Sequence, residues 1–230
     1  MAKLIETEVR AEHRWPAFIA ILVALALYAL LPSSFLPIVR YTVVAIGVAL
    51  LVPVFILNPL RLSKQTKWSR ALSLSLASLL AAANGLALVQ LVIQLVTGDK
   101  ADGLTLVLAA LQVWITQVIA FGLIFWELDR GGPVVRSTSP RDSLPEADFR
   151  FPQDENADNV KEVAAGSSQK SGWTANYVDY LYFSLTYSMA FSAADAMPLT
   201  HRAKILSGIE AFGAYVLLAL VIARAVSLLG

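Results

Sequence analysis

Carboxyl and hydroxyl groups stand within an otherwise apolar stretch near the end of the chain, residues 177–229. Ser192 and Asp195 lie in its short aromatic first half, and Glu210 lies in the apolar run that follows. A carboxyl group at membrane depth is protonated, paired or turned toward water, and rings of carboxylates attract cations. These residues therefore predict ion or proton chemistry. A structural role stays open for each: Asp195 could cap the last helix or pair with Arg202, and Glu210 could support a loop from behind.

Covalent catalysis is not indicated by the residue types available. The chain has no cysteine, and its two histidines, His13 and His201, lie far apart in the sequence. Asp154, Asn156 and Asp158 begin like a calcium-binding EF-hand loop, but the glycine and the bidentate glutamate that complete such a loop are missing. We therefore expect no enzyme activity, no metal site and no cofactor.

The composition predicts a membrane protein. Of 230 residues, 57% are hydrophobic and only 15% are charged, and the mean hydropathy is +0.63. A soluble core of this size needs a far more charged shell. The lipid bilayer is therefore the expected partner, and the formal net charge of +1 gives no indication of nucleic acid.

Apolar segments of helical length predict the positions of the membrane spans. They lie at about 15–31, 38–57, 71–96 and 104–128, with a fifth in the last 30 residues or so. The segment from Tyr177 to Pro198 is too polar for an ordinary span and too apolar for an ordinary loop. We therefore expect an all-α polytopic protein with five transmembrane helices and a re-entrant helix and loop before the last. Its regions would be a charged N-terminal segment (1–14), a four-helix membrane region (15–128), a polar extramembrane loop (129–172) and a helical hairpin (173–230).

The polar loop begins where Asp129 to Pro133, a run containing two glycines and a proline, stops the fourth span. The residues from 134 to 172 are rich in Ser, Pro, Asp and Glu, so most of this segment is predicted to be mobile. Phe149, Phe151 and Pro152 are the candidates for anchoring part of it.

Small and polar residues inside the spans suggest how the helices meet. Ser73, Ala77, Ala81 and Gly85 recur every four residues and predict a ridge for close helix packing. A second set consists of carboxyl and amide side chains that could form an intramembrane polar cluster: Asn84, Gln112, Gln117 and Glu210. Such a cluster favours a secondary transporter or small-molecule carrier as the alternative function, although hydrogen bonding between helices also explains the amides.

Lysine and arginine are distributed unevenly between the two predicted sides. With five spans, one side carries the N-terminus, the loop after the second span, the 129–172 loop and the start of the last helix. The other side keeps only Arg40, Lys100 and Arg224. The basic side is predicted to be cytoplasmic, with the N-terminus inside and the C-terminus outside.

The last 50 residues or so resemble the pore module of potassium channels. The resemblance rests on Tyr182-Phe183-Ser184, then Asp195 and Pro198, then Glu210 and the run 219–224. It implies a pore helix, a filter and an inner helix, assembled as a homo-oligomer, with a tetramer expected. The patterns FWELDRGGP and AFSxxDxMPL are also similar to uncharacterised bacterial multi-pass membrane proteins, which implies the plasma (inner) membrane.

The filter positions depart from the potassium-channel pattern. Ala190, Ser192, Ala193 and Ala194 stand where that family has threonine, glycine, tyrosine and glycine, and Phe191 lies between the first two. A Cβ in the left-handed backbone of such a filter costs about 1–2 kcal/mol. Potassium selectivity is therefore not implied. We expect a wider, weakly selective pore for monovalent cations, formed by residues 190–195 and supported by Tyr187, Pro198 and Glu210.

The side of the membrane that the loop faces stays open, and so does the number of spans. The lysine and arginine count places the loop on the cytoplasmic side, whereas potassium channels present it outside. Either the hairpin is inverted, which we favour, or Tyr177 to Pro198 crosses the membrane fully and gives six spans. An accessory membrane subunit with no transport activity is a further alternative.

Overall fold

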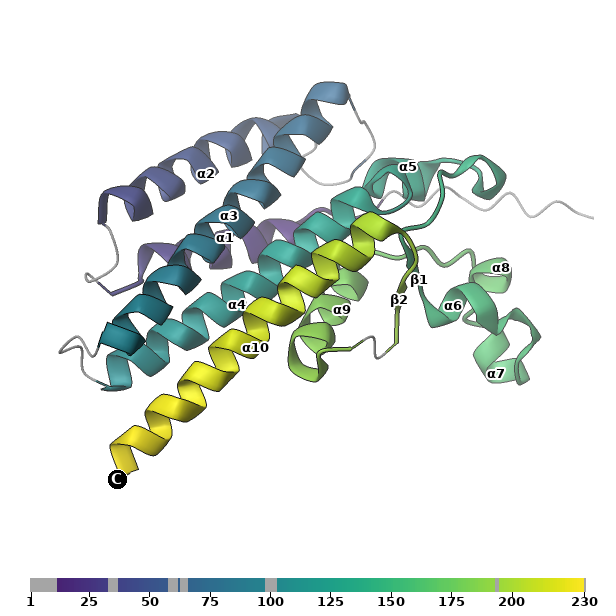
Figure 1. Cartoon of the computed structure of the whole chain (residues 1–230). Helices are drawn as coiled ribbons and strands as arrows, with labels where there is room; N and C mark the ends of the chain where they lie inside the picture. The colour runs from purple at the N-terminus through teal and green to yellow at the C-terminus, as the bar shows by residue number, and fades with distance from the viewer. Residues whose placement is uncertain are drawn as a thin grey trace, which may run out of the picture.

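The computed structural model is built almost entirely of α-helices, and it describes residues 12–32, 37–57, 62, 66–97, 103–192 and 195–229 (Figure 1). In chain order the elements are α1 (Trp15–Ala29), α2 (Pro37–Leu57), α3 (Lys67–Thr97), α4 (Gly103–Leu128), the 3-10 turn η1 (Asp129–Gly131), α5 (Pro133–Thr138), η2 (Arg141–Ser143), β1 (Phe149–Arg150), α6 (Pro152–Glu155), η3 (Asn156–Asp158), α7 (Lys161–Ala164), α8 (Ser168–Ser171), α9 (Tyr177–Ala190), β2 (Met197–Pro198) and α10 (His201–Leu229). The all-α prediction is confirmed.

Four helices in the described part of the chain are long and apolar enough to cross a membrane. They include residues 38–57, 67–97, 104–131 and 201–224, close to four of the predicted spans. α1 is apolar but has only 15 residues, about 22 Å of helix, which is shorter than a typical span of about 20 residues. The protein is therefore a multi-helix protein of membrane type.

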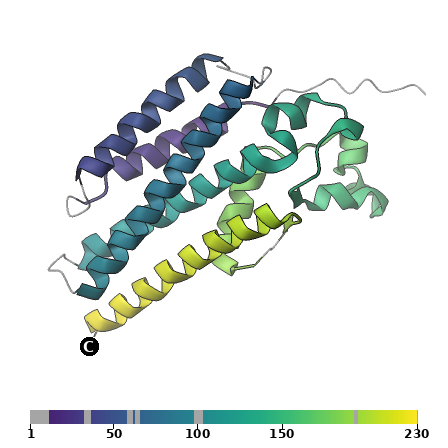
Figure 2. The same cartoon turned by 45° about the horizontal axis from the view of Figure 1, so that its top comes forward.

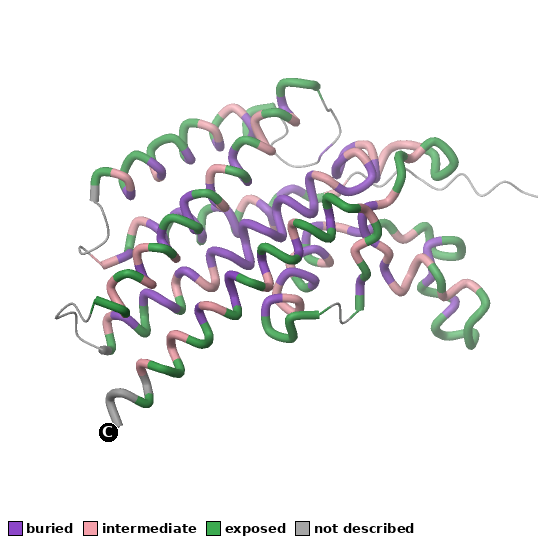
Figure 3. The backbone as a smooth tube through the Cα atoms, in the orientation of Figure 1, coloured by how far each residue is buried: buried purple, intermediate pink, exposed green. Residues whose placement is uncertain are grey.

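The long helices form a bundle with α4 at its centre, between α3 and α1 on one side and α9 and α10 on the other (Figure 2). In α4, 67% of the most apolar 18-residue stretch is buried, whereas the corresponding stretches of α2 and α10 are each 28% buried. Figure 3 shows the same contrast, with α4 mostly buried while α2 and α10 are exposed along one face. That exposed surface is apolar, including Ile46, Val52, Ile209 and Phe212, as expected of helices that face lipid.

α1 and α2 form an antiparallel pair in which each helix end is capped by an arginine from the other helix's start. The Arg14 guanidinium, just before α1, donates to the Val54 carbonyl in the last turn of α2. Arg40, in the first turn of α2, donates to the Leu31 carbonyl just after α1. The last carbonyls of a helix lack partners within it and carry partial negative charge, so a buried arginine satisfies both needs.

α3 packs through a face that coincides only in part with the predicted small-residue ridge. Gly85 is exposed, and a Cβ added there would meet no atom within 4 Å. The buried positions of α3 instead follow a spacing of three and four residues: Leu76, Ala77, Leu80, Ala83, Asn84, Ala87 and Leu91. The ridge prediction is therefore wrong at Gly85, whereas Ala77 is buried and Ala81 packs against the core. The buried face of α3 combines leucines with alanines.

The segment between α4 and α9 is folded into short helices at one end of the bundle, where the sequence suggested a mainly mobile loop (Figure 1). Phe149 and Phe151 are buried, which confirms them as anchors. The Phe149 ring lies 5.0 Å from the rings of both Phe125 in α4 and Phe183 in α9. This aromatic cluster ties the loop to the end of α4 and the middle of α9.

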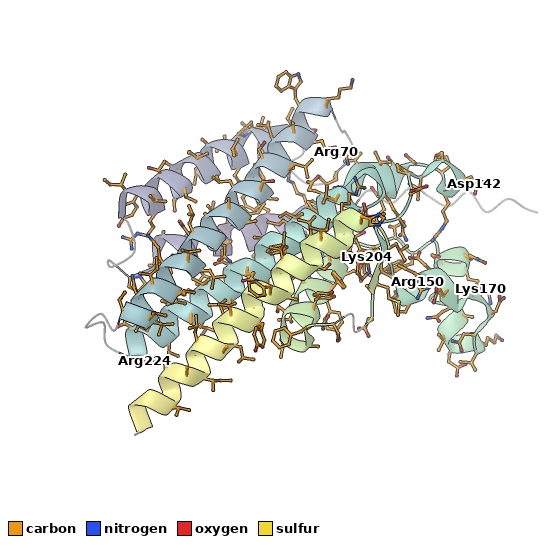
Figure 4. All side chains as sticks on the ribbon, viewed as in Figure 1. Arg70, Asp142, Arg150, Lys170, Lys204 and Arg224 are labelled. Atoms are coloured by element: carbon orange, nitrogen blue, oxygen red, sulfur yellow. The ribbon has the colours of Figure 1, made fainter. Side chains whose placement is uncertain are left out.

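Charged side chains concentrate at this same end of the bundle. Figure 4 places Arg70, Arg150, Lys170 and Lys204 there, and Arg224 toward the opposite end. The grouping of basic residues expected from the sequence is therefore present for these positions.

Candidate functional site: the α9 loop and the buried Glu210

α9 begins at the end of the bundle where α4 stops. Asn176 caps it: its Oδ1 accepts from the Val178 N–H at 2.9 Å, and the Asp179 carboxylate accepts from the Asn176 N–H at 2.8 Å. The Tyr180 hydroxyl donates to the buried carboxylate of Asp129, directly after α4. The start of α9 is therefore fixed at the charged end of the molecule.

α9 stops after 14 residues, about 21 Å, at a left-handed turn. Phe191 has φ 53°, and its N–H donates to the Tyr187 carbonyl at 2.9 Å. The centre of the Phe191 ring lies 5.8 Å from that of Tyr215 in α10. Tyr215 is 14 residues after His201, so the turn lies about 21 Å along α10 from its first residue.

The chain then returns to the charged end before α10 begins. β2 pairs antiparallel with β1, Phe149 opposite Pro198, and the Leu199 N–H donates to the Asp148 carbonyl at 2.8 Å. The Asp148 N–H in turn donates to Asp129 Oδ1 at 2.7 Å. α9 and α10 therefore start at the same end of the bundle, and the turn that ends α9 lies partway along α10, at the surface of the bundle (Figure 1).

The described loop residues lie on the surface of the single chain. Ala190, Phe191, Ser192 and Asp195 are exposed, while Ala193 and Ala194 lie outside the described residues. Two of the predicted supporting residues are partly buried: Tyr187 lies against Phe183, with ring centres 5.3 Å apart, and Pro198 belongs to β2. Any constriction formed by this loop would need further copies of the chain.

Arg202 forms its ion pair with Asp148 and not with Asp195. Arg202 donates from Nε to Asp148 Oδ1 at 2.7 Å and from Nη2 to Asp148 Oδ2, and Thr200 Oγ1 also donates to Asp148. The Asp148 side chain is 1% exposed. A planar guanidinium on a carboxylate in this two-bond arrangement holds the start of α10 against the loop. Of the two structural roles left open for Asp195, pairing with Arg202 is therefore not the one adopted, because Asp148 is the partner of Arg202.

Glu210 lies fully buried between α4, α9 and α10. Its Oε1 is hydrogen-bonded to the Ser184 hydroxyl of α9, and that same hydroxyl lies 2.8 Å from the Val118 carbonyl of α4. Gln117 Nε2 donates to the Glu210 backbone carbonyl at 2.6 Å. Glu210 Oε2 and Gln117 Oε1 are buried and have no hydrogen-bond partner among the described residues. This is the polar centre of the terminal hairpin.

The four residues proposed for a carrier cluster are not all brought together. Gln117 and Glu210 touch through the bond just described, and Gly213 of α10 lets the Gln117 amide approach, because a Cβ there would lie 2.9 Å from Gln117 Nε2. Gln112 instead points toward α1, with Nε2 3.5 Å from the Leu30 carbonyl. Asn84 is buried on α3, and its Oδ1 has no partner among the described residues.

Sequence reasoning missed the residue at the centre of the charged end, Arg136. Its guanidinium is 1% exposed and donates to the carbonyls of Ala175, Trp126 and Asp129 at 2.8–3.1 Å. It also lies 4.8 Å from the centre of the Tyr180 ring. Arg136 thus caps the end of α4 and holds the approach to α9. The available signal was its position, three residues after the break at Pro133.

Glu12 connects the N-terminal segment to this centre. Its Oε1 accepts from the Tyr177 N–H at 2.8 Å and from the Trp126 indole at 3.0 Å. Burial raises the pKa of Glu12 to about 7, while the nearby Arg136 guanidinium and these donors act in the opposite direction. Trp126, near the end of α4, is 4% exposed, and its indole N–H is one of these donors.

Asp154, the first acid of the EF-hand-like run, has a structural role. Asp154 accepts from Arg130 Nη2 at 2.7 Å and from Arg141 Nη2 at 2.9 Å. Arg130 has φ 50° and begins the turn continued by Gly131 and Gly132, so this pair stabilises an unfavourable backbone conformation. Within the described residues, no group of acids and histidines has the arrangement of a metal site.

Comparisons of this chain with protein-family models, with curated proteins and with solved structures found no match.

Proposed function

We propose that this protein is an ion-channel-like membrane protein of the bacterial inner membrane, in which α1, α2, α3, α4 and α10 cross the bilayer and α9 with its loop is re-entrant. The observation that carries the proposal is the path of residues 177–201. α9 runs for 14 residues away from the charged end of the bundle, the chain turns at Phe191 beside Tyr215, and α10 begins at the charged end again. A hydrocarbon core is about 30 Å thick, so a turn about 21 Å along α10 lies inside it.

The packing of α9 supports the same proposal. α9 lies between α4 and α10, as a pore helix lies between the outer and inner helices in the family that the terminal residues resemble. Irregular backbone at membrane depth is tolerated where protein or water surrounds it. In one chain Ser192 and Asp195 are exposed, and a ring of chains would place them around a shared aqueous axis. A tetramer is the proposed assembly.

Asp195 is the proposed source of cation preference. A ring of carboxylates attracts cations, and Ser192 adds hydroxyls without the closely spaced carbonyls of a potassium filter. We therefore expect weak selectivity among monovalent cations. The basic end of the bundle, and with it the mouth of the loop, would face the cytoplasm.

Cation flux into liposomes tests this function. Asp195→Asn should lower the flux because each subunit loses a charge at the mouth, whereas Asp142→Asn, an exposed acid on the extramembrane segment, should leave it unchanged. A strictly monomeric protein in mild detergent would exclude the channel. Strong preference for potassium over sodium would contradict the proposed filter.

A carrier is the second candidate, and the contact between Gln117 and Glu210 favours it. It predicts the opposite sensitivity: Glu210→Gln abolishes transport and Asp195→Asn matters little. Absence of flux from correctly assembled wild-type protein would favour the accessory-subunit alternative.

A further inference from the structure

The Ser184 hydroxyl has more acceptors around it than it has hydrogens. Its Oγ lies within hydrogen-bond distance of two oxygens, the Val118 carbonyl at 2.8 Å and Glu210 Oε1. A hydroxyl carries one hydrogen and donates one bond at a time. If Glu210 were a carboxylate, both neighbours would be acceptors, and one of the two close oxygen pairs would have no hydrogen between its members.

A proton on Glu210 resolves this conflict. The carboxylic acid donates to Ser184 Oγ, and the Ser184 hydroxyl donates to the Val118 carbonyl, so each close pair contains one hydrogen. This chain of two bonds runs from α10 through α9 to α4.

The surroundings of Glu210 offer no compensation for a negative charge. Among the described residues, no arginine, lysine or histidine forms an ion pair with it. From α9 it faces Ser184 and the titratable Tyr187; from α4 it is approached by Gln117, whose amide bonds its backbone carbonyl rather than its carboxyl group. An isolated buried charge is far more costly than an unpaired neutral carbonyl oxygen, which is what Oε2 would be in the acid.

We propose that Glu210 is a proton-binding site within the membrane, occupied at neutral pH, and that its proton joins α10 to the re-entrant helix α9 through Ser184. Release of this proton would place a charge in the seam between α4, α9 and α10. The charge would be stable only after water or a cation had entered this interface between the three helices. Proton release would therefore accompany separation of the helices around Glu210.

Infrared spectroscopy of the full-length protein in lipid tests the proposal, because a protonated carboxyl group and a carboxylate absorb in separate regions. Spectra of wild type and Glu210→Gln would be compared at about pH 8, where exposed carboxyl groups are ionised. The expected difference is the loss of one protonated-carboxyl band that shifts in deuterium oxide. Loss of a carboxylate band instead would overturn the proposal.

Ser184→Ala provides the second variant, in case Glu210→Gln does not fold. The proposal predicts that the band stays and moves to higher frequency, because the acid has lost the hydroxyl to which it donates. Disappearance of the protonated-carboxyl band in this variant would also overturn it. Either outcome is independent of whether the protein conducts ions.

Discussion

Gly122 of α4 lies directly against the backbone of Leu181 in α9. A Cβ added at position 122 would stand 3.2 Å from the Leu181 Cα, which is closer than ordinary contact. Main-chain atoms cannot rotate away as the end of a side chain can. The absence of a side chain at this position therefore sets how closely α9 approaches the centre of the bundle.

Gly122→Ala should push α9 away from α4 and destabilise the protein by about 1–3 kcal/mol, the usual cost of overpacking. The measurement is the thermal unfolding midpoint in detergent. Gly208→Ala is the matched control, because a Cβ there meets nothing within 4 Å and alanine favours helix. Equal destabilisation by both variants would contradict this packing.

The pair formed by Arg202 and Asp148 should stabilise the start of α10. Arg202→Gln removes two donors from a carboxylate that is 1% exposed, which should cost about 1–3 kcal/mol. Arg202 itself is 56% exposed, so solvent screens part of the attraction. Arg150→Gln is the control: its pair with Glu155 is exposed on both sides and should contribute about 0–1 kcal/mol. A larger loss for Arg150→Gln than for Arg202→Gln would refute the assignment.

The residues around Arg202 show what the sequence could predict. The apolar runs predicted the four long helices and the short α1 to within a few residues, because an apolar run of helical length is a property of the local sequence. The partner of Arg202 could not be obtained in this way. Asp195 is seven residues away in sequence, but Asp148, 54 residues away, is brought to Arg202 by the pairing of β1 with β2.

Arg136 was missed for the same physical reason. Its three carbonyl partners come from the end of α4 and from the approach to α9, so its role exists only once those segments meet. Glu210 could be recognised from sequence because a lone acid in an apolar helix is conspicuous. Its contact with Ser184, however, depends on how α9 folds back.

Arg136→Lys should destabilise the protein by at least about 2 kcal/mol. An ammonium group is a point donor and cannot reproduce a planar guanidinium that reaches three carbonyls and lies over the Tyr180 ring. Arg141→Lys is the control because Arg141 is 45% exposed and bonds only Asp154 among the described residues. Thermal unfolding in detergent distinguishes the two, and a tolerated lysine at position 136 would show that charge alone suffices.

The stability of the charged end should fall as the pH rises. The pKa of Glu12 is raised to about 7 from 4.5, so the folded chain holds this proton more tightly than the unfolded chain. Its favourable contribution is complete below about pH 4.5 and is lost by about pH 7, at most about 3 kcal/mol. The unfolding midpoint of wild type should therefore decrease over this range.

Glu12→Gln should flatten that pH dependence while keeping an oxygen that accepts from Tyr177 and Trp126. Glu162→Gln, in the exposed helix α7, should keep the wild-type profile. An unchanged slope in Glu12→Gln would assign the pH dependence to another group.

The central claim, that the chain turns back within the membrane between α9 and α10, is tested most directly by cysteine labelling, for which this cysteine-free chain is suited. Lys170→Cys in α8, Lys204→Cys at the start of α10 and Val226→Cys near its end, all exposed, would be treated with a membrane-impermeant maleimide in right-side-out and inside-out vesicles. The re-entrant arrangement predicts that positions 170 and 204 react from the same, cytoplasmic side and that position 226 reacts from the opposite side. Reaction of positions 170 and 204 from opposite sides would mean that residues 177–198 cross the membrane fully, and would contradict the account.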